Sequence, residues 1–133
     1  MAIRIVRLGT PRGAAEGVRL GTVRRPPRGV RKADYARRDF FDAWLPELAP
    51  SARLVKWIGE APASDSRWAT FTERYRREMG EAGAARLLDV LARLSRDANL
   101  AVGCYCENYH RCHRSILEQL LREHGARVAA NPS

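Results

Sequence analysis

Apolar residues near the start of the chain alternate with polar ones, which is the pattern of half-buried strands. Ile3, Ile5 and Leu8 indicate a first strand, and residues 18–23 indicate a second. A turn at residues 11–13 joins them, so we expect a short pair of strands. The chain therefore opens with β structure.

The next region is rich in proline and breaks this pattern. Residues 25–29 must be a loop, because adjacent prolines remove two hydrogen-bond donors and restrict the backbone before them. In residues 39–50 the apolar spacing is helical, yet Pro46 and Pro50 favour an extended segment. We expect the extended form.

Three amphipathic patterns then predict helices, over residues 51–59, 65–80 and 84–99. Ser51 can cap the first and Asp65 or Ser66 the second, while Gly59 and Gly80 end them. The second helix carries an apolar stripe that is typical of a core face, formed by Trp68, Phe71, Tyr75 and Met79.

The last third places a strand before a helix. Residues 100–106 are apolar on both alternating faces, as in a central strand covered by helices on two sides. A helix follows from near Cys112 to Gly125, and residues 127–130 can add a parallel strand through a right-handed crossover. The sequence predicts one α/β domain over residues 1–133, with a small, mostly parallel sheet flanked by helices.

Charge changes this picture in one region. The net charge of +9 lies within residues 1–38, which hold eleven basic and two acidic residues, while the rest of the chain is balanced. Within this region, residues 24–32 form a basic loop. Nearly all the basic residues are arginine, whose planar fork binds phosphate and carboxylate. The imbalance predicts an anionic partner, which is either a small ligand or a nucleic acid.

Hydropathy and cysteine content argue against a membrane protein and against a secreted protein. The longest strongly apolar, uncharged stretch, residues 99–106, is far shorter than a membrane span, and the arginines at the amino terminus interrupt any secretory signal. Three cysteines within nine positions do not resemble a secreted disulfide framework. We expect a soluble cytoplasmic protein with no membrane partner.

The segment 104–114 is the candidate site. At about 100° per residue, His113 points inward on the predicted helix, with Cys112 and Arg114 at the edges of its apolar stripe. Cys106 lies at the carboxyl end of the strand, where open α/β sheets bind ligands. The helix start favours an anion, so these four side chains should converge on one crevice.

This crevice suits thiolate chemistry on a small phosphorylated or otherwise anionic ligand, because nearby imidazole and guanidinium groups favour the thiolate. The expected catalytic residues are Cys106 or Cys112 as the thiolate and His113 as base or orienting group. The expected ligand-binding residues are Arg24, Arg28, Glu107, Asn108 and Arg114. We expect Cys104 to be a core residue.

Other interpretations stay open. A nucleic-acid-binding module could use residues 1–38, with the cysteines structural or bound to zinc. Zinc would take all three cysteines with His110 or His113, but paired C-x-x-C motifs are missing, so we predict no metal and no cofactor. Cys106 could transfer sulfur or phosphoryl groups, or form a redox pair with Cys112.

The chain also resembles a known family, the bacterial proteins of domain of unknown function 488, which include the YeaO-like proteins. The resemblance covers nearly the whole chain and rests on residues 17–19, 27–30, 44–51, 106–108 and 112–114, with Arg24, Lys32, Trp68, Phe71 and Tyr75. The chain has Val23 and Pro26 where YeaO-like members are expected to have aspartate and tryptophan. The resemblance implies a compact α/β domain that holds the loop at 24–28 within the fold, and implies no established reaction.

Overall fold

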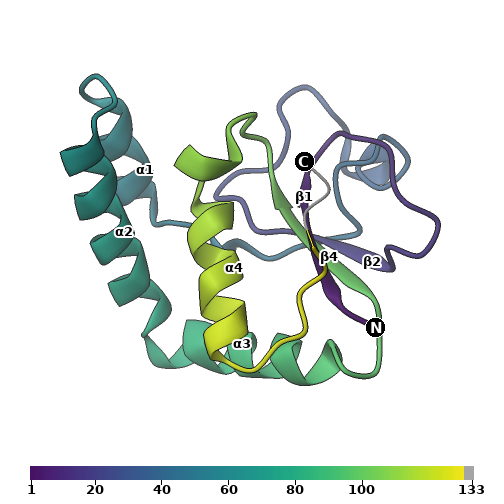
Figure 1. The fold of residues 1–133 in the computed structure, drawn as a ribbon. Coiled ribbons are helices and arrows are strands. Elements are labelled where there is room, and N and C mark those ends of the chain that lie inside the picture. Colours follow the sequence, from purple (N-terminus) through teal and green to yellow (C-terminus); the bar gives the residue numbers. More distant parts are fainter. Residues whose placement is uncertain (131–133) are drawn as a thin grey trace.

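A computed structural model describes residues 1–130 of the chain, and its centre is a parallel β-sheet (Figure 1). The strands are β1 (Ile3–Arg7), β2 (Val18–Gly21), β3 (Ala43–Trp44) and β4 (Leu100–Cys104). They lie in the order β1-β4-β2-β3, and every pair of neighbours is parallel. The α/β class and the parallel sheet expected from the sequence are confirmed.

The expected pairing of the first two strands is wrong, because β4 lies between β1 and β2. Leu100 is opposite Ile3 on one side and Val18 on the other. All five residues of β4 are buried, whereas β1 and β2 each expose some of theirs. A strand that is dry on both faces belongs at the centre of a sheet. Residues 127–130 add a single parallel bridge, from Val128 to Ile3, rather than a full strand.

Four α-helices follow the predicted order. They are α1 (Ala52–Gly59), α2 (Asp65–Met79), α3 (Ala82–Leu94) and α4 (His113–Glu123). Ser51 caps α1 by accepting a hydrogen bond from the Leu54 N–H, as expected. Ser64, not Asp65 or Ser66, caps α2. Three short 3-10 turns complete the structure, at Lys32–Asp34, Pro46–Leu48 and Tyr109–Arg111.

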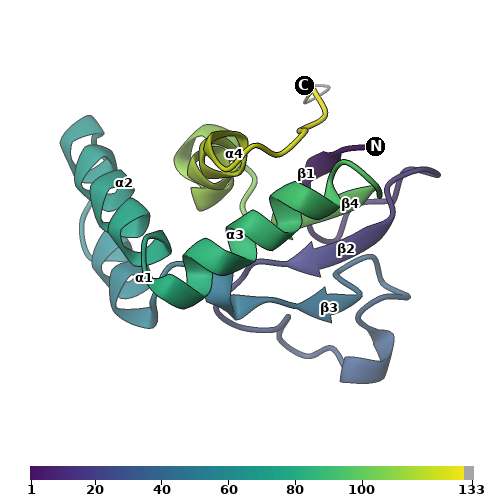
Figure 2. The ribbon, with the colours of Figure 1, turned by 90° about the horizontal axis from the view of Figure 1, so that it is seen from below.

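The helices and the sheet occupy different parts of the molecule. In both views α1 and α2 form one end and the sheet the other, with α4 between them (Figures 1 and 2). The main core joins apolar residues of the sheet, such as Val102, to residues of α4 such as Leu117. Within residues 1–130, no helix has the length and apolar character that a bilayer crossing requires.

The opposite face of the sheet is covered by loops rather than by the helices expected there. Phe41 packs where a Gly21 side chain would lie, and Leu8 does the same at Gly103. On this side Arg19 is fully buried, and its guanidinium contacts the Glu16 carboxylate at 2.8 and 2.9 Å. Its remaining N–H groups donate to the carbonyls of Thr10 and Asp39. A buried arginine fork therefore organises these loops.

Candidate functional site

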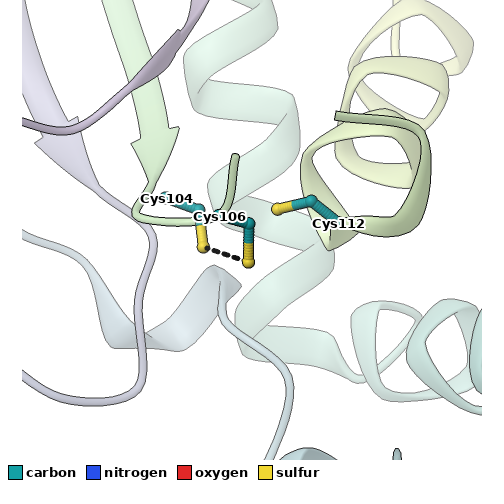
Figure 3. A group of neighbouring side chains, drawn as sticks. All are labelled: Cys104, Cys106 and Cys112. Carbon is teal, nitrogen blue, oxygen red and sulfur yellow. Dashed lines mark hydrogen bonds between the residues drawn. The ribbon is translucent and has the colours of Figure 1, made fainter. Parts of the chain in front are cut away.

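Three cysteines meet where β4 ends and α4 begins (Figure 3). Cys104 is the last residue of β4, Cys106 follows it in the loop, and Cys112 is the residue before the first turn of α4. Their three Sγ atoms all lie within 4.8 Å of one another, and those of Cys104 and Cys106 are 3.7 Å apart. Asn108 turns the intervening loop by accepting a hydrogen bond from the His110 N–H. The strand and the helix thus bring distant thiols together.

The three thiols differ in their acidity. Hydrogen bonds from Cys104 and Cys106 lower the pKa of Cys112 far below its usual range, despite burial, and His113 lowers it further. Hydrogen bonds with Cys106 and Cys112, together with burial, raise the pKa of Cys104. The hydrogen bond with Cys104 lowers the pKa of Cys106, but the hydrogen bond with Cys112 and burial outweigh this effect, so the pKa of Cys106 is raised. Among the three thiols, Cys112 is therefore the one whose surroundings most favour the thiolate form.

A backbone carbonyl fixes the orientation of the His113 ring. Its Nε2 lies 2.7 Å from the backbone carbonyl of Thr22, and because a carbonyl can only accept, Nε2 must carry a hydrogen. The other nitrogen, Nδ1, is 3.9 Å from the Cys112 Sγ. The ring edge packs against Tyr75, which is completely buried. The imidazole is therefore oriented with Nδ1 toward the thiolate.

Arg114 supports the cluster from behind. It is buried, its Nε donates to the Cys112 Sγ at 3.4 Å, and its Nη2 donates to the Cys106 carbonyl at 2.6 Å. The guanidinium also lies over the ring of Tyr109, at 5.8 Å from its centroid. This charge stabilises the thiolate and fixes the loop, and Arg114 does not line the cavity described next.

A cavity of about 840 Å³ opens in front of the cluster. It is lined by all three cysteines and His113, and by apolar residues of α1, α2 and the loops. Its basic lining consists of Arg24, Arg25, Arg53, Lys56 and Arg111. Among residues 1–130, no aspartate or glutamate lines it. Cys112 therefore faces a space whose wall carries basic and no acidic side chains, and we call this space the cysteine cavity.

The predicted site residues separate into two groups. Cys106, Cys112, His113 and Arg24 line the cysteine cavity, with Arg114 directly behind it. Arg24 is also tied to the fold, since it donates hydrogen bonds to three carbonyls within residues 46–50.

The remaining predicted residues lie outside the cavity. Arg28 is exposed and does not line it. Glu107 is exposed and pairs with Arg7 at 3.4 Å, while Asn108 serves the turn of the loop.

The sequence reasoning missed four basic residues of the cavity. Arg25 is adjacent to Arg24, Arg111 is adjacent to Cys112, and Arg53 and Lys56 are one helical turn apart on α1. The i, i+3 spacing of the α1 pair was a detectable signal for a shared helix face. What the sequence does not reveal is that α1 lines the same cavity as the residues at the ends of β2 and β4.

The three thiols could also hold a soft metal ion. In zinc sites the Zn–S bond is about 2.3 Å, which places neighbouring sulfurs about 3.8 Å apart. The separation of Cys104 and Cys106 is close to this value, and Cys112 completes a set of three ligands. The geometry thus permits two chemistries, a free thiolate and a metal thiolate, and experiment can separate them.

Together the parallel sheet and the cysteine cavity define an α/β protein whose candidate site lies at the carboxyl ends of the strands. The chain belongs to the family of domain of unknown function 488: a family model described as the active DUF488-N3 subclade matches residues 3–125. This confirms the family expected from the sequence. No curated protein and no solved structure matches the chain.

Proposed function

We propose that the protein binds a small phosphorylated or otherwise anionic ligand in the cysteine cavity and acts on it through the Cys112 thiolate. The observation that carries this proposal is the cavity lining, in which five basic side chains and no acidic one surround a thiol whose pKa is lowered. Such a combination of a shaped cavity, a shifted pKa and convergent polar groups is typical of an active site.

The basic lining favours an anion because most of its charge is uncompensated. Among residues 1–130, Arg25, Arg53 and Lys56 have no carboxylate within ion-pair distance. Arg111 pairs with Asp65, which is almost fully exposed, so this pair contributes little neutralisation. An anionic ligand would supply the missing counter-charge, and guanidinium groups bind phosphate through paired hydrogen bonds.

Each group of the cluster has a distinct role in this proposal. The Cys112 thiolate is the nucleophile, and the His113 Nδ1 accepts or returns the thiol proton. Arg114 is a positioning residue that stabilises the thiolate. Cys106 is exposed and lies at the rim, where it is a second thiol within reach of the first.

Alkylation by a small neutral reagent tests the thiolate. We expect Cys106 to react before Cys104 because Cys106 is exposed. We expect Cys112 to react before Cys104 because, although both are buried, only the pKa of Cys112 is lowered. As the pH falls from about 9 to about 6, the rate at Cys112 should hold while that at Cys106 declines, since only the pKa of Cys112 is lowered. Peptide mass spectrometry reads each site, and inorganic phosphate should slow the reaction at Cys112.

Two results would contradict the thiolate role. Equal, slow labelling of the three cysteines in the folded protein would show that none is activated. Near-stoichiometric zinc retained through dialysis would make the cysteines metal ligands instead of nucleophiles. Arg28→Ala is the matched control, because Arg28 is exposed and lies outside the cavity.

A further inference from the structure

We infer that the ligand of the cysteine cavity carries an aromatic ring next to its anionic group, as a nucleoside monophosphate does. This inference rests on the proposed function and adds the chemical class of the ligand. It follows from the parts of the lining that an inorganic anion would not use.

Much of the cavity wall is apolar and faces open space. Val55 of α1 is 45% exposed although it lines the cavity, and Ile58 of the same helix and Val23 beyond β2 line it as well. A hydrated anion gains nothing from such surfaces, whereas a ligand with an apolar part would remove them from water. The bound molecule therefore needs an apolar portion as well as a charge.

The aromatic part of the wall is held in place before any ligand arrives. The Tyr105 hydroxyl donates to the Arg25 carbonyl at 3.1 Å, and its ring edge packs on Phe40 at 6.2 Å between centroids. Trp68 stacks on the buried Phe71, with centroids 4.9 Å apart and planes inclined by 14°. Rings fixed in this way can stack on a planar ligand without a large loss of conformational freedom.

Each of these two half-buried rings also has an arginine near it. Tyr105 is bonded to the backbone of Arg25, and the Arg111 guanidinium lies 5.9 Å from the centroid of Trp68. All four side chains line the cavity. A base that stacks on either ring would lie in the same cavity as the Arg25 and Arg111 side chains, whose guanidinium groups can bind an attached phosphate. This alternation of rings and charges is the recognition pattern of nucleotides.

The size of the cavity agrees with this class. Its volume of about 840 Å³ lies in the usual range of small-molecule sites, about 300–1,000 Å³. Inorganic phosphate would leave most of this space to water. A free nucleotide and the phosphorylated end of a single strand share the required chemistry, so the experiment must distinguish these two sources.

Isothermal titration calorimetry with four ligands tests the inference. The panel is AMP, UMP, pentyl phosphate and inorganic phosphate, in the same buffer. We expect the two nucleotides to bind at least about tenfold more tightly than pentyl or inorganic phosphate, because a base adds stacking on an aromatic side chain. A titration with a 5′-phosphorylated single-stranded oligonucleotide then distinguishes the two sources. An affinity equal to that of AMP indicates a free nucleotide as the ligand, and a higher affinity indicates the end of a strand.

Variants connect the affinity to the proposed rings. Tyr105→Leu and Trp68→Leu keep an apolar wall, and each should remove most of the advantage of AMP over phosphate while phosphate affinity stays unchanged. Arg28→Ala is the control, since Arg28 is exposed and lies outside the cavity. Thermal melting checks that each variant is folded. If Trp68→Leu does not fold, the comparison of AMP with phosphate is made with Tyr105→Leu alone.

The possible failures are distinguishable. Phosphate binding without any gain for the nucleotides, or equal binding of pentyl phosphate and AMP, would overturn the aromatic ligand and leave the proposed function in place. The absence of binding by every ligand in the panel would overturn the proposed function itself.

Discussion

Most arginines described in the first third and the basic residues of α1 have opposite relations to the fold. In the first third, Arg19 is buried against Glu16, Arg12 pairs with Asp42 at 2.7 Å, and Arg24 holds backbone carbonyls. Two of the cavity's basic residues, Arg53 and Lys56, come from the part of the chain whose charges balance, yet both are exposed and unpaired among residues 1–130.

A region of the sequence with an excess of basic residues is therefore not always the region that provides unpaired positive charge at the surface of the folded protein. Several arginines of residues 1–38 form ion pairs or hydrogen bonds within the protein. Helix α1, from the part of the chain whose charges balance, places the unpaired Arg53 and Lys56 on the cavity wall. The functional charge is set by which side chains lack partners at one surface. Substitutions in the two groups should therefore act on different properties of the molecule.

The largest effect should come from the buried pair. Glu16→Ala leaves the fully buried Arg19 guanidinium without its carboxylate, which should cost about 3–5 kcal/mol of the free energy of unfolding. Urea denaturation followed by circular dichroism measures this loss. If the variant stays as stable as the parent, Arg19 does not depend on Glu16, and the structural role assigned to the basic region is wrong.

An intermediate effect, on binding instead of stability, should come from α1. The double substitution Arg53→Ala with Lys56→Ala should change the free energy of unfolding by no more than about 0.5 kcal/mol, because both side chains are exposed. Phosphate affinity should fall about tenfold or more, since a hydrogen bond to a charged group contributes about 1.5–3 kcal/mol. Calorimetry beside denaturation separates the two quantities, and unchanged affinity would refute the basic wall as a binding surface.

The smallest effect should come from Arg28. Arg28→Ala should alter neither stability nor phosphate affinity, because the side chain is exposed and lies outside the cavity. Titration of a short DNA duplex at several salt concentrations sharpens this test. A log–log slope near −0.9 per phosphate contacted, reduced by about one in the variant, would favour the nucleic-acid-binding alternative.

Local signals in the sequence predicted the elements well. Proline and glycine positions, the Ser51 cap and the apolar stripe of α2 gave helices close to those observed. They also placed Cys112 at the start of α4. Cys106, expected as the last residue of the strand, instead lies just beyond the end of β4. These features depend on neighbours within one helical turn or one strand, so the residues that determine them are adjacent in the sequence.

Contacts between residues that are far apart in the sequence could not be predicted from these local signals. The expected pairing of β1 with β2 failed because nothing near either strand encodes that residues 100–104 will lie between them. The same holds for Arg53 and Lys56, which share a cavity with thiols about 50 residues further along the chain. Arg28 shows the converse error, since a basic residue in a basic loop can still point away from the site.

The central position of β4 has a consequence for the order of folding. Leu100 to Cys104 supply the backbone partners of both β1 and β2, so the first 21 residues leave the ribosome long before the strand that joins them. Until then, the small β2–β3 contact is the pairing in this sheet that the emerging chain can form. Completion of the sheet must therefore be a late step in synthesis, and its slow, non-local character follows from the topology. The same step joins Thr22 to Gly103, the residue before Cys104, so the sheet and the site are completed together.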